Sequence, residues 1–194
     1  MRHDIDIEGF GYRLRPISEE DAELVVSLRS DARLGRYLHP GAQDVESQLK
    51  WFEQYFERPG DYYFVIERLD RSTPDGVIAI YGVDSTLMTG EWGRWILRAG
   101  SPAAVESAYL IYSVAFDVLR LESIVCRTVA ENQKVVSFHD SCGLKMRRIL
   151  PGHFVIAGRR LDAVEHRLAR RDWPDISAKL RVIARAAARR MARA

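Results

Sequence analysis

The chain has 194 residues, of which 47% are hydrophobic and 29% charged, a length that favours one well-filled domain. It has no run of about 18 apolar residues that could span a membrane, and its start, MRHDIDIEGF, is too acidic and polar for a signal peptide, so we expect a cytoplasmic protein. The formal net charge is only +2, and the Lys and Arg excess is concentrated in residues 175–194. A basic body that binds nucleic acid is therefore not expected.

Two helices are predicted before residue 60. Ser18 and Asp21 form a capping-box pair at the start of the first, after a short strand over residues 12–15. Asp44 caps the second, which has an apolar side at helical spacing and carries Trp51 and Tyr55 on its other side, so we expect it to be covered on two faces. The residues expected to be buried are Leu24, Val25 and Leu28 in the first helix and Val45, Leu49, Phe52 and Phe56 in the second.

The rest of the body alternates between strands and helices. Strands over 62–69, 77–83 and 92–97, with turn-forming residues between them, predict an antiparallel meander. A helix over 103–119, a strand over 122–129, a helix over 133–141 and strands over 145–150 and 161–168 follow, the last two joined through Gly152 and Gly158. This order from residue 92 onward predicts parallel pairing in that half. We expect a mixed α+β fold with helices on both faces of the sheet.

The division predicted is a domain over residues 1–174 and a basic amphipathic helix over residues 175–194. One face of this helix is apolar: Ile176, Leu180, Ile183, Ala187 and Met191. We expect that face to dock on the body of the chain or on a second subunit, which would make a homodimer. The alternative is binding to an anionic surface or to nucleic acid.

The stretch ENQKVVSFHDSCGL contains a lone histidine, His139. Seven residues are close to two helical turns, so Asn132 and His139 lie along one side of the helix. A second side is apolar and is expected to face the core: Val135, Phe138 and Cys142. The Asn/His line should then face elsewhere. Gly143 explains the end of the helix by capping, whereas nothing in the local helix chemistry explains the histidine.

This stretch resembles the segment of the GNAT superfamily of acetyl-CoA-dependent N-acetyltransferases in which an Asn precedes a short helix, a Tyr or His, and Gly-Phe. The similarity extends to YRLRPISEEDAELVVSLR, LKWFEQYF, YYFVIE, GVIAIYGVD, WGRWI, AFDVLRLESIVCRTVAEN and GRRLDAVEHRLARRDW, and so covers about residues 12–173. The order and spacing of these motifs carry it. It implies a mostly antiparallel sheet of about seven strands, in which the fourth strand (92–97) and the fifth (123–129) splay apart.

The resemblance also implies a cofactor site. The pantetheine arm of acetyl-CoA would bind between the splayed strands, on the backbone of Trp95, Ile96 and Leu97, and Asn132 would contact the cofactor. His139 matches the position that protonates the departing thiolate of coenzyme A. Imidazole, with an unperturbed pKa of about 6.5, suits this role near neutral pH.

The pyrophosphate loop departs from the superfamily pattern of two glycines spaced as G-x-G. Gly100 keeps the first glycine, but Pro102 replaces the second and has no N–H to donate. Ser101 as N-cap, the amides of Ala103 and Ala104 at the start of the helix and the charge of Arg98 could hold the diphosphate instead. We expect acetyl-CoA to bind more weakly than usual or in a different pose.

A general base and an acceptor pocket complete the expected site. Glu91 is the first candidate for the base and Asp84 the second; the alternative for each is a solvated carboxylate at a strand end. The loop Tyr37–Gly41 with Trp51, Tyr55 and Trp95 either lines the acceptor pocket or packs in the core. Cys126 and Cys142 lack metal-ligand spacing, so we expect buried free thiols and no metal.

The acceptor is predicted from subfamily likeness. KWFEQYF, YYFVIE and His139 most resemble the amino-sugar nucleotide N-acetyltransferases, and next the ribosomal-protein N-terminal acetyltransferases. The acceptor would then be a small-molecule amine or a peptide N-terminus. A non-catalytic protein that binds acyl-CoA is the alternative of a different class.

Overall fold

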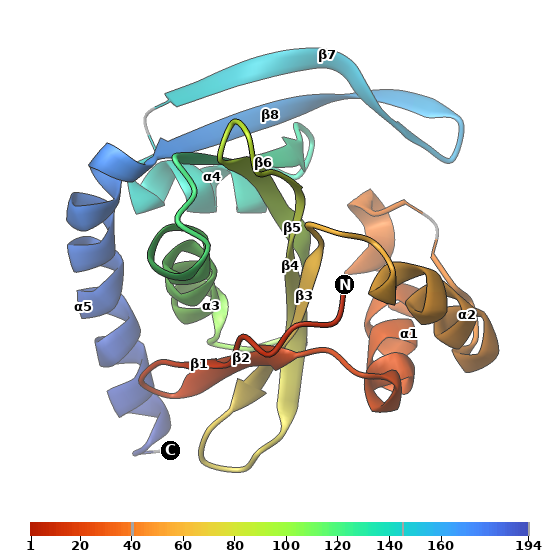
Figure 1. Cartoon of the computed structure of the whole chain (residues 1–194), viewed down its shortest axis with the longest axis horizontal. Coiled ribbons are helices and arrows are strands. Elements are labelled where there is room, and N and C mark those ends of the chain that lie inside the picture. The colour runs from red at the N-terminus through yellow and green to blue at the C-terminus, as the bar shows by residue number, and fades with distance from the viewer. Residues whose placement is uncertain (40, 145, 194) are drawn as a thin grey trace.

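The computed structural model describes residues 1–39, 41–144 and 146–193. Eight strands form one sheet in the order β1-β2-β3-β4-β5-β6-β8-β7 (Figure 1). The strands are β1 (Ile7–Glu8), β2 (Tyr12–Pro16), β3 (Tyr62–Arg68), β4 (Pro74–Asp84), β5 (Thr89–Leu97), β6 (Ser123–Val129), β7 (Met146–Ile156) and β8 (Arg159–Ala169). The mixed, mostly antiparallel sheet is confirmed, with a short first strand that the sequence did not predict.

Strand pairing in the second half differs from the expectation of parallel neighbours. Among the strands of the described residues, β5 and β6 are the one parallel pair, whereas β6–β8 and β7–β8 are antiparallel. After β6, the chain passes through a helix to the outer edge of the sheet and returns by a hairpin, so β8 fills the place beside β6. A strand–helix–strand order does not predict parallel pairing when the second strand skips a position.

The β7–β8 hairpin is longer than predicted. Its strands extend to Ile156 and from Arg159, leaving Ala157 and Gly158 as a two-residue turn. Both turn residues have positive φ, +48° and +76°, as expected for a turn matched to the twist of a hairpin. Lys145, predicted to start the first of these strands, lies outside the described residues.

Five α-helices cover the sheet: α1 (Ala22–Ser30), α2 (Val45–Phe56), α3 (Ala104–Ser113), α4 (Gln133–Cys142) and α5 (Trp173–Met191). Helices α1 and α2 lie on one face, and α3, α4 and α5 on the other (Figure 1). Alternate residues of the central strands serve the two faces: Tyr63, Val65, Val77 and Ala79 on one, Phe64, Ile66, Ile78 and Ile80 on the other. The predicted placement of helices on both faces is confirmed.

Helix α2 begins at its predicted cap, whereas the cap predicted for the first helix starts a 3-10 turn (Glu19–Asp21) that leads into α1, whose own N-cap is Asp21. Ser18 and Asp21 form a capping box, and Asp44 accepts a hydrogen bond from the Ser47 amide at 2.8 Å. Both predicted sides of α2 contribute buried residues, Phe52 from the apolar side and Tyr55 from the aromatic side, together with Gln48, whereas Val45 is 41% exposed. Tyr55 faces inward because its hydroxyl accepts a hydrogen bond from the Tyr63 amide at 2.9 Å.

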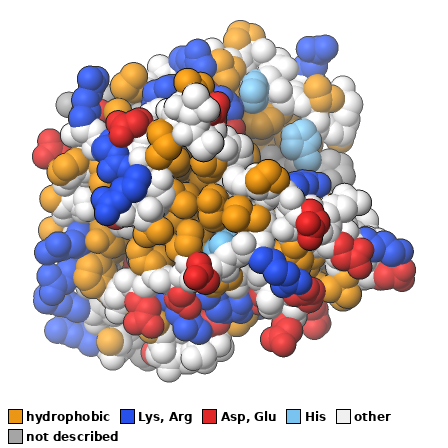
Figure 2. All heavy atoms as spheres, in the orientation of Figure 1, with side chains coloured by type: hydrophobic (Ala, Val, Ile, Leu, Met, Phe, Trp, Pro, Cys, Tyr) orange, Lys and Arg blue, Asp and Glu red, His pale blue; other side chains and the backbone are white. Residues whose placement is uncertain are grey.

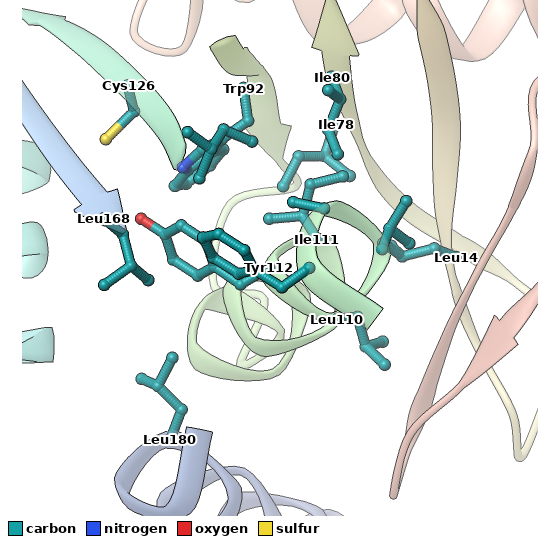
Figure 3. Packing of buried hydrophobic residues seen from close by; sticks show 14 of the residues in the cluster. Leu14, Ile78, Ile80, Trp92, Leu110, Ile111, Tyr112, Cys126, Leu168 and Leu180 are labelled. Carbon is teal, nitrogen blue, oxygen red and sulfur yellow. The ribbon is translucent and has the colours of Figure 1, made fainter. Parts of the chain in front are cut away.

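Helix α5 packs on α3. Leu180 and Ala184 are fully buried, and Figure 3 shows Leu180 directed toward the interior that Leu110, Ile111 and Tyr112 of α3 also fill. Ile183, predicted on the docking face, is 42% exposed, because the helix turns the neighbouring Ala184 inward. Lys and Arg side chains gather along the edge of the molecule that α5 occupies (Figure 2). In the described part of the chain, no helix is long and apolar enough to cross a membrane.

Candidate active site

A pocket opens where the sheet splits. Within the described residues, strands β5 and β6 pair only where Thr89–Glu91 of β5 lies beside Ser123–Val125 of β6. Beyond these residues the two strands diverge, as the predicted splay requires. The cavity has a volume of about 660 Å³. Its lining includes β5 and β6 residues Trp92, Gly93, Arg94, Trp95, Cys126, Arg127, Thr128 and Val129. Strand edges without a neighbour offer backbone hydrogen bonds to an extended ligand.

A bulge in β5 shapes the pocket wall. Opposite β4, the register moves from Val77↔Ile96 to Ala79↔Gly93, so Arg94 and Trp95 together face one residue. Arg94 adopts φ +48° at this point. Trp92 and Trp95 are three residues apart and would lie on opposite faces of a regular strand. The bulge places both on the same face, with ring centroids 5.6 Å apart.

His139 lies against these tryptophans. Its ring centroid is 5.2 Å from that of Trp92 and 6.3 Å from that of Trp95, and the residue is only 2% exposed. The expectation that the Asn/His line faces away from the core is wrong: Val136, His139 and Cys142 form the buried side of α4. The pocket lies within the interior, so the side of the helix that faces the core also faces the site.

Burial changes the chemistry of His139. Loss of solvent, and secondarily the nearby His166, lowers the pKa of His139 to about 3. The expected unperturbed pKa of about 6.5 is therefore wrong for His139, and its ring is neutral near pH 7. It can still donate or accept a proton through a hydrogen bond, but not as a resident imidazolium.

His166 and Asp140 lie behind His139, and the sequence analysis missed both. His166 of β8 is 1% exposed, with its ring centroid 5.2 Å from that of His139, and its Nε2 is 3.0 Å from Asp140 Oδ1. The one signal for His166 in the sequence is its inward position in the strand AVEHRL. The strand order that brings it to His139 is a long-range property.

The carboxylate of Glu91 is already occupied. It accepts a hydrogen bond from the Tyr81 hydroxyl at 3.0 Å and forms an ion pair with Arg127. Glu91 lies at the last position of β5 that pairs with β6 and does not line the pocket. Asp84, the second candidate, does not line the pocket either. Its carboxylate accepts hydrogen bonds from the Thr86 and Leu87 amides in the β4–β5 turn.

The predicted cofactor residues fall into two groups. Trp95 and Asn132 line the pocket together with His139. Ile96 and Leu97 continue β5 beyond it, paired with Val77 and Gly76 of β4 on one side. Within the described residues, neither has a paired strand on the β6 side. That free edge fits the amide groups of a pantetheine arm.

The loop before α3 differs from the expected cap. Ala103, not Ser101, is the N-cap, and the Ser101 hydroxyl accepts from the Ala103 amide at 3.1 Å. The same hydroxyl donates to Asp75, which also accepts from Tyr12. The Arg98 guanidinium donates to the Pro74 carbonyl at 2.9 Å.

This loop still fits a diphosphate, but with fewer hydrogen-bond donors than the superfamily pattern provides. Gly100 takes φ +81°, and the Ala104 amide points out of the first turn of α3. No hydrogen bond of the Ala104 amide occurs among the described residues. The Asp75 carboxylate adds an opposing negative charge, so the helix start and Arg98 would hold the anion with fewer donors than a G-x-G loop provides.

The other half of the pocket faces α1 and α2. Tyr37, Leu38, His39 and Gly41 from the predicted loop line it together with Trp51, while Pro40 lies outside the described residues. Tyr55, buried behind Trp51, does not line it; the two rings stack with centroids 5.4 Å apart. Four arginines line the pocket: Arg29, Arg58, Arg94 and Arg127. No Asp or Glu of the described residues does.

Both cysteines are buried and free, as predicted. Among residues 1–39, 41–144 and 146–193, no group of three His, Cys, Asp or Glu side chains could hold a metal ion.

Comparison with known proteins agrees with this geometry. The chain is similar to an apo structure of FdhC, a nucleotide-linked sugar GNAT, with 26% identity over 94% of this chain and 98% of that one, and a TM-score of 0.76. It is also similar to a GCN5-related N-acetyltransferase from Brucella melitensis (20% identity, 93% and 86% covered, TM-score 0.79). A third neighbour is spermidine N-acetyltransferase from Vibrio cholerae in complex with CoA and spermine (17%, 84% and 98%, TM-score 0.76).

A search of curated proteins finds no match. The family model described as "Acetyltransferase (GNAT) domain" matches residues 12–145. With this match, the open sheet and the acetyltransferase neighbours, the chain belongs to the GNAT family of N-acetyltransferases.

Proposed function

We propose that this enzyme transfers the acetyl group of acetyl-CoA to the amine of an amino-sugar nucleotide. The observation that carries the proposal is the charge of the pocket, which is lined by four arginines and, among the described residues, by no acidic side chain. A nucleoside diphosphate is anionic and presents a flat base, and both features suit such a site. The name of the neighbour FdhC supports the same class.

Arg29 and Arg58 are the arginines available to the acceptor. Arg94 is held by Asp61 at 2.6 Å and 2.9 Å, and Arg127 is held by Glu91 and Glu165. Neither Arg29 nor Arg58 forms an ion pair with a described residue, although the Arg29 guanidinium donates to the His39 carbonyl at 2.7 Å. The Arg58 guanidinium lies 5.5 Å from the Trp51 ring centroid, so a cation and an aromatic face stand side by side in the acceptor half.

In the reaction, a neutral amine adds to the thioester carbonyl and the thiolate of coenzyme A leaves. A backbone N–H of β5 near the bulge would stabilise the oxyanion. Trp92 and Trp95 exclude water from the reacting atoms, and His139 is the pocket side chain that would exchange a proton with them. The base role of Glu91 stays a prediction, made harder by its bonds to Tyr81 and Arg127.

Every acceptor reacts through an amine, so the alternative acceptors differ from an amino-sugar nucleotide in the charge of the rest of the molecule. A polyamine, the acceptor of the Vibrio cholerae neighbour, would place several cations among the arginines. A peptide N-terminus carries a single amine and is less repelled by the arginines than a polyamine is, so it is the second candidate. A protein that only binds acyl-CoA would occupy the gap without turnover.

The test measures thiol release from acetyl-CoA with nucleoside-diphosphate amino sugars, peptides and spermidine as acceptors. We expect turnover with a nucleotide-linked amino sugar and none with spermidine. Arg58→Gln should raise the acceptor KM about tenfold and leave the acetyl-CoA KM unchanged, because it removes one charged hydrogen bond. Arg71→Gln, exposed and outside the pocket, is the matched control. Turnover with peptides alone would overturn the choice of acceptor, and none at all would favour the binding protein.

A further inference from the structure

Two buried polar side chains line the acceptor half of the pocket. Gln48 of α2 is 3% exposed and Tyr63 of β3 is 1% exposed, yet both belong to the pocket wall. No hydrogen bond joins the Gln48 carboxamide or the Tyr63 hydroxyl to a described residue, and neither group is among the fully buried unpaired atoms. Buried polar groups in proteins almost always have a partner, so both groups are available to a ligand in the pocket.

Tyr63 lies near the reacting end of the pocket. It stands opposite Ala79 of β4, which in turn stands opposite Gly93 of β5, at the edge of the bulge. Two strand spacings, about 10 Å, therefore separate the backbone of Tyr63 from that of Gly93. The Tyr63 side chain is on the face of the sheet that α1 and α2 cover (Figure 1). Its ring stands edge-on to that of Trp51, with centroids 6.1 Å apart at an interplanar angle of 81°.

Gln48 reaches the same place from the helix. It lies three residues before Trp51 on α2, and residues at this spacing are neighbours on a helix surface. Both residues line the pocket, so the carboxamide and the indole face it side by side. Trp51 is thus an aromatic ring with one neutral polar group on its own helix and a second on the strand below.

The polar groups of the acceptor half differ with depth. Arg58 is exposed and Arg29 half-buried, whereas Gln48 and Tyr63 are almost fully buried. Burial raises the pKa of Tyr63 to about 12, although the nearby Arg94 and Arg29 oppose this, so the hydroxyl keeps its hydrogen near pH 7.

This arrangement suits a ligand with one neutral and one anionic part. A carboxamide and a phenol can each donate and accept hydrogen bonds. The deep part of the acceptor half therefore fits a neutral group that also donates and accepts, and the outer part fits an anion. A nucleotide-linked amino sugar has its groups in this order, because the amine is on a ring of hydroxyl groups and the phosphates lie beyond that ring.

We propose that Gln48 and Tyr63 are specificity-determining residues that hydrogen-bond hydroxyl groups of the acceptor's sugar ring. The C–H face of the ring lies against Trp51, and the phosphates lie toward Arg29 and Arg58. A few placed polar groups beside an aromatic wall are the usual means by which a pocket fixes the orientation of its ligand. This inference rests on the proposed function and extends it to the part of the acceptor that the enzyme recognises.

The first test compares substitutions that remove the polar groups and keep their bulk. Tyr63→Phe and Gln48→Met should each lower kcat/KM for a nucleotide-linked amino sugar about tenfold, because a hydrogen bond to the substrate is lost. The affinity for coenzyme A, measured by calorimetry, should not change. Tyr62→Phe, on the other face of β3, and Gln54→Met, on the exposed side of α2, are the matched controls. Neither control residue lines the pocket, and both variants should behave as wild type.

The second test uses acceptors that lack one ring hydroxyl at a time. Wild type should discriminate against at least two of these deoxy analogues by about 10- to 100-fold in kcat/KM, because each leaves a buried protein group unpaired. Tyr63→Phe should lose the discrimination against one analogue and Gln48→Met that against another, as in a double-mutant cycle. A purely structural effect would lower kcat/KM for all acceptors alike and leave the discrimination unchanged.

The outcomes separate this inference from the proposed function. Wild-type discrimination in both folded variants would overturn the inference and leave the acceptor class standing. Its loss in one variant alone would assign the sugar contact to that residue and remove it from the other. If wild type acetylates no nucleotide-linked amino sugar, the proposed function is overturned and this inference with it.

Discussion

The residue with the most unusual surroundings is His139. In the unfolded chain it binds a proton below a pKa of about 6.5. In the folded chain burial lowers that pKa to about 3, so the unfolded state holds the extra proton between these values. The free energy of unfolding must therefore fall as pH falls through this window. The group should remove about 2 kcal/mol between pH 7.5 and pH 5.

Urea unfolding of wild type and His139→Gln at both pH values measures this. The variant has no group to protonate, so its unfolding free energy should fall by about 2 kcal/mol less over the same interval. Equal falls in the two proteins would mean that His139 is not held neutral by burial.

At the same scale, the sequence predicted that His139 matters but not its surroundings. Spacing placed Asn132 and His139 on one side of a helix, and the resemblance to the GNAT superfamily implied their roles; both line the pocket. His166 and Asp140 could not be paired from the sequence, because β8 reaches α4 only through the returning hairpin. The Glu91–Arg127 ion pair is equally a contact between strands. Local periodicity carries no information about such contacts.

Among the elements, β5 differs most from what its hydrophobic pattern predicts. The sequence predicts a strand at 92–97, and alternation would separate its two tryptophans. The bulge at Arg94 that brings them together has no signal beyond Gly93. Helix α5, by contrast, was predicted with its apolar face, and only Ile183 and Ala184 exchange roles. Period and capping predict elements well, whereas bulges and strand order depend on the assembled sheet.

The packing of α5 leads to a prediction with a control on the same helix. Leu180 is fully buried against α3, and Val182 is 69% exposed. Leu180→Ala should lower the free energy of unfolding by about 2–5 kcal/mol, because it leaves a cavity in the core. Val182→Ala should change it by less than about 0.5 kcal/mol. Urea unfolding distinguishes the two, and equal small effects would mean that α5 does not dock on its own body in solution.

At the scale of the whole molecule, the sheet consists of two parts joined by a short seam. Strands β1–β5 and β6, β8 and β7 meet only where Thr89–Glu91 pairs with Ser123–Val125. The core on the α3 side holds the parts together, because it contains residues of β5 and of β6 and β8, such as Trp92, Cys126 and Leu168. The residues of β5 beyond Glu91 are left without a partner strand on the β6 side. A ligand that adds backbone-like amides between β5 and β6 would complete the sheet.

Acetyl-CoA should therefore stabilise the fold as a whole. At a concentration 100 times its Kd, a ligand that binds only the folded state adds about 2.7 kcal/mol, which for a chain of this size raises Tm by about 5–10 °C. Adenosine 3′,5′-bisphosphate lacks the pantetheine arm and can engage only the start of α3, so its shift at the same concentration should be much smaller. Equal shifts would place the binding energy at the phosphates, and the gap between β5 and β6 would then not be the acyl site.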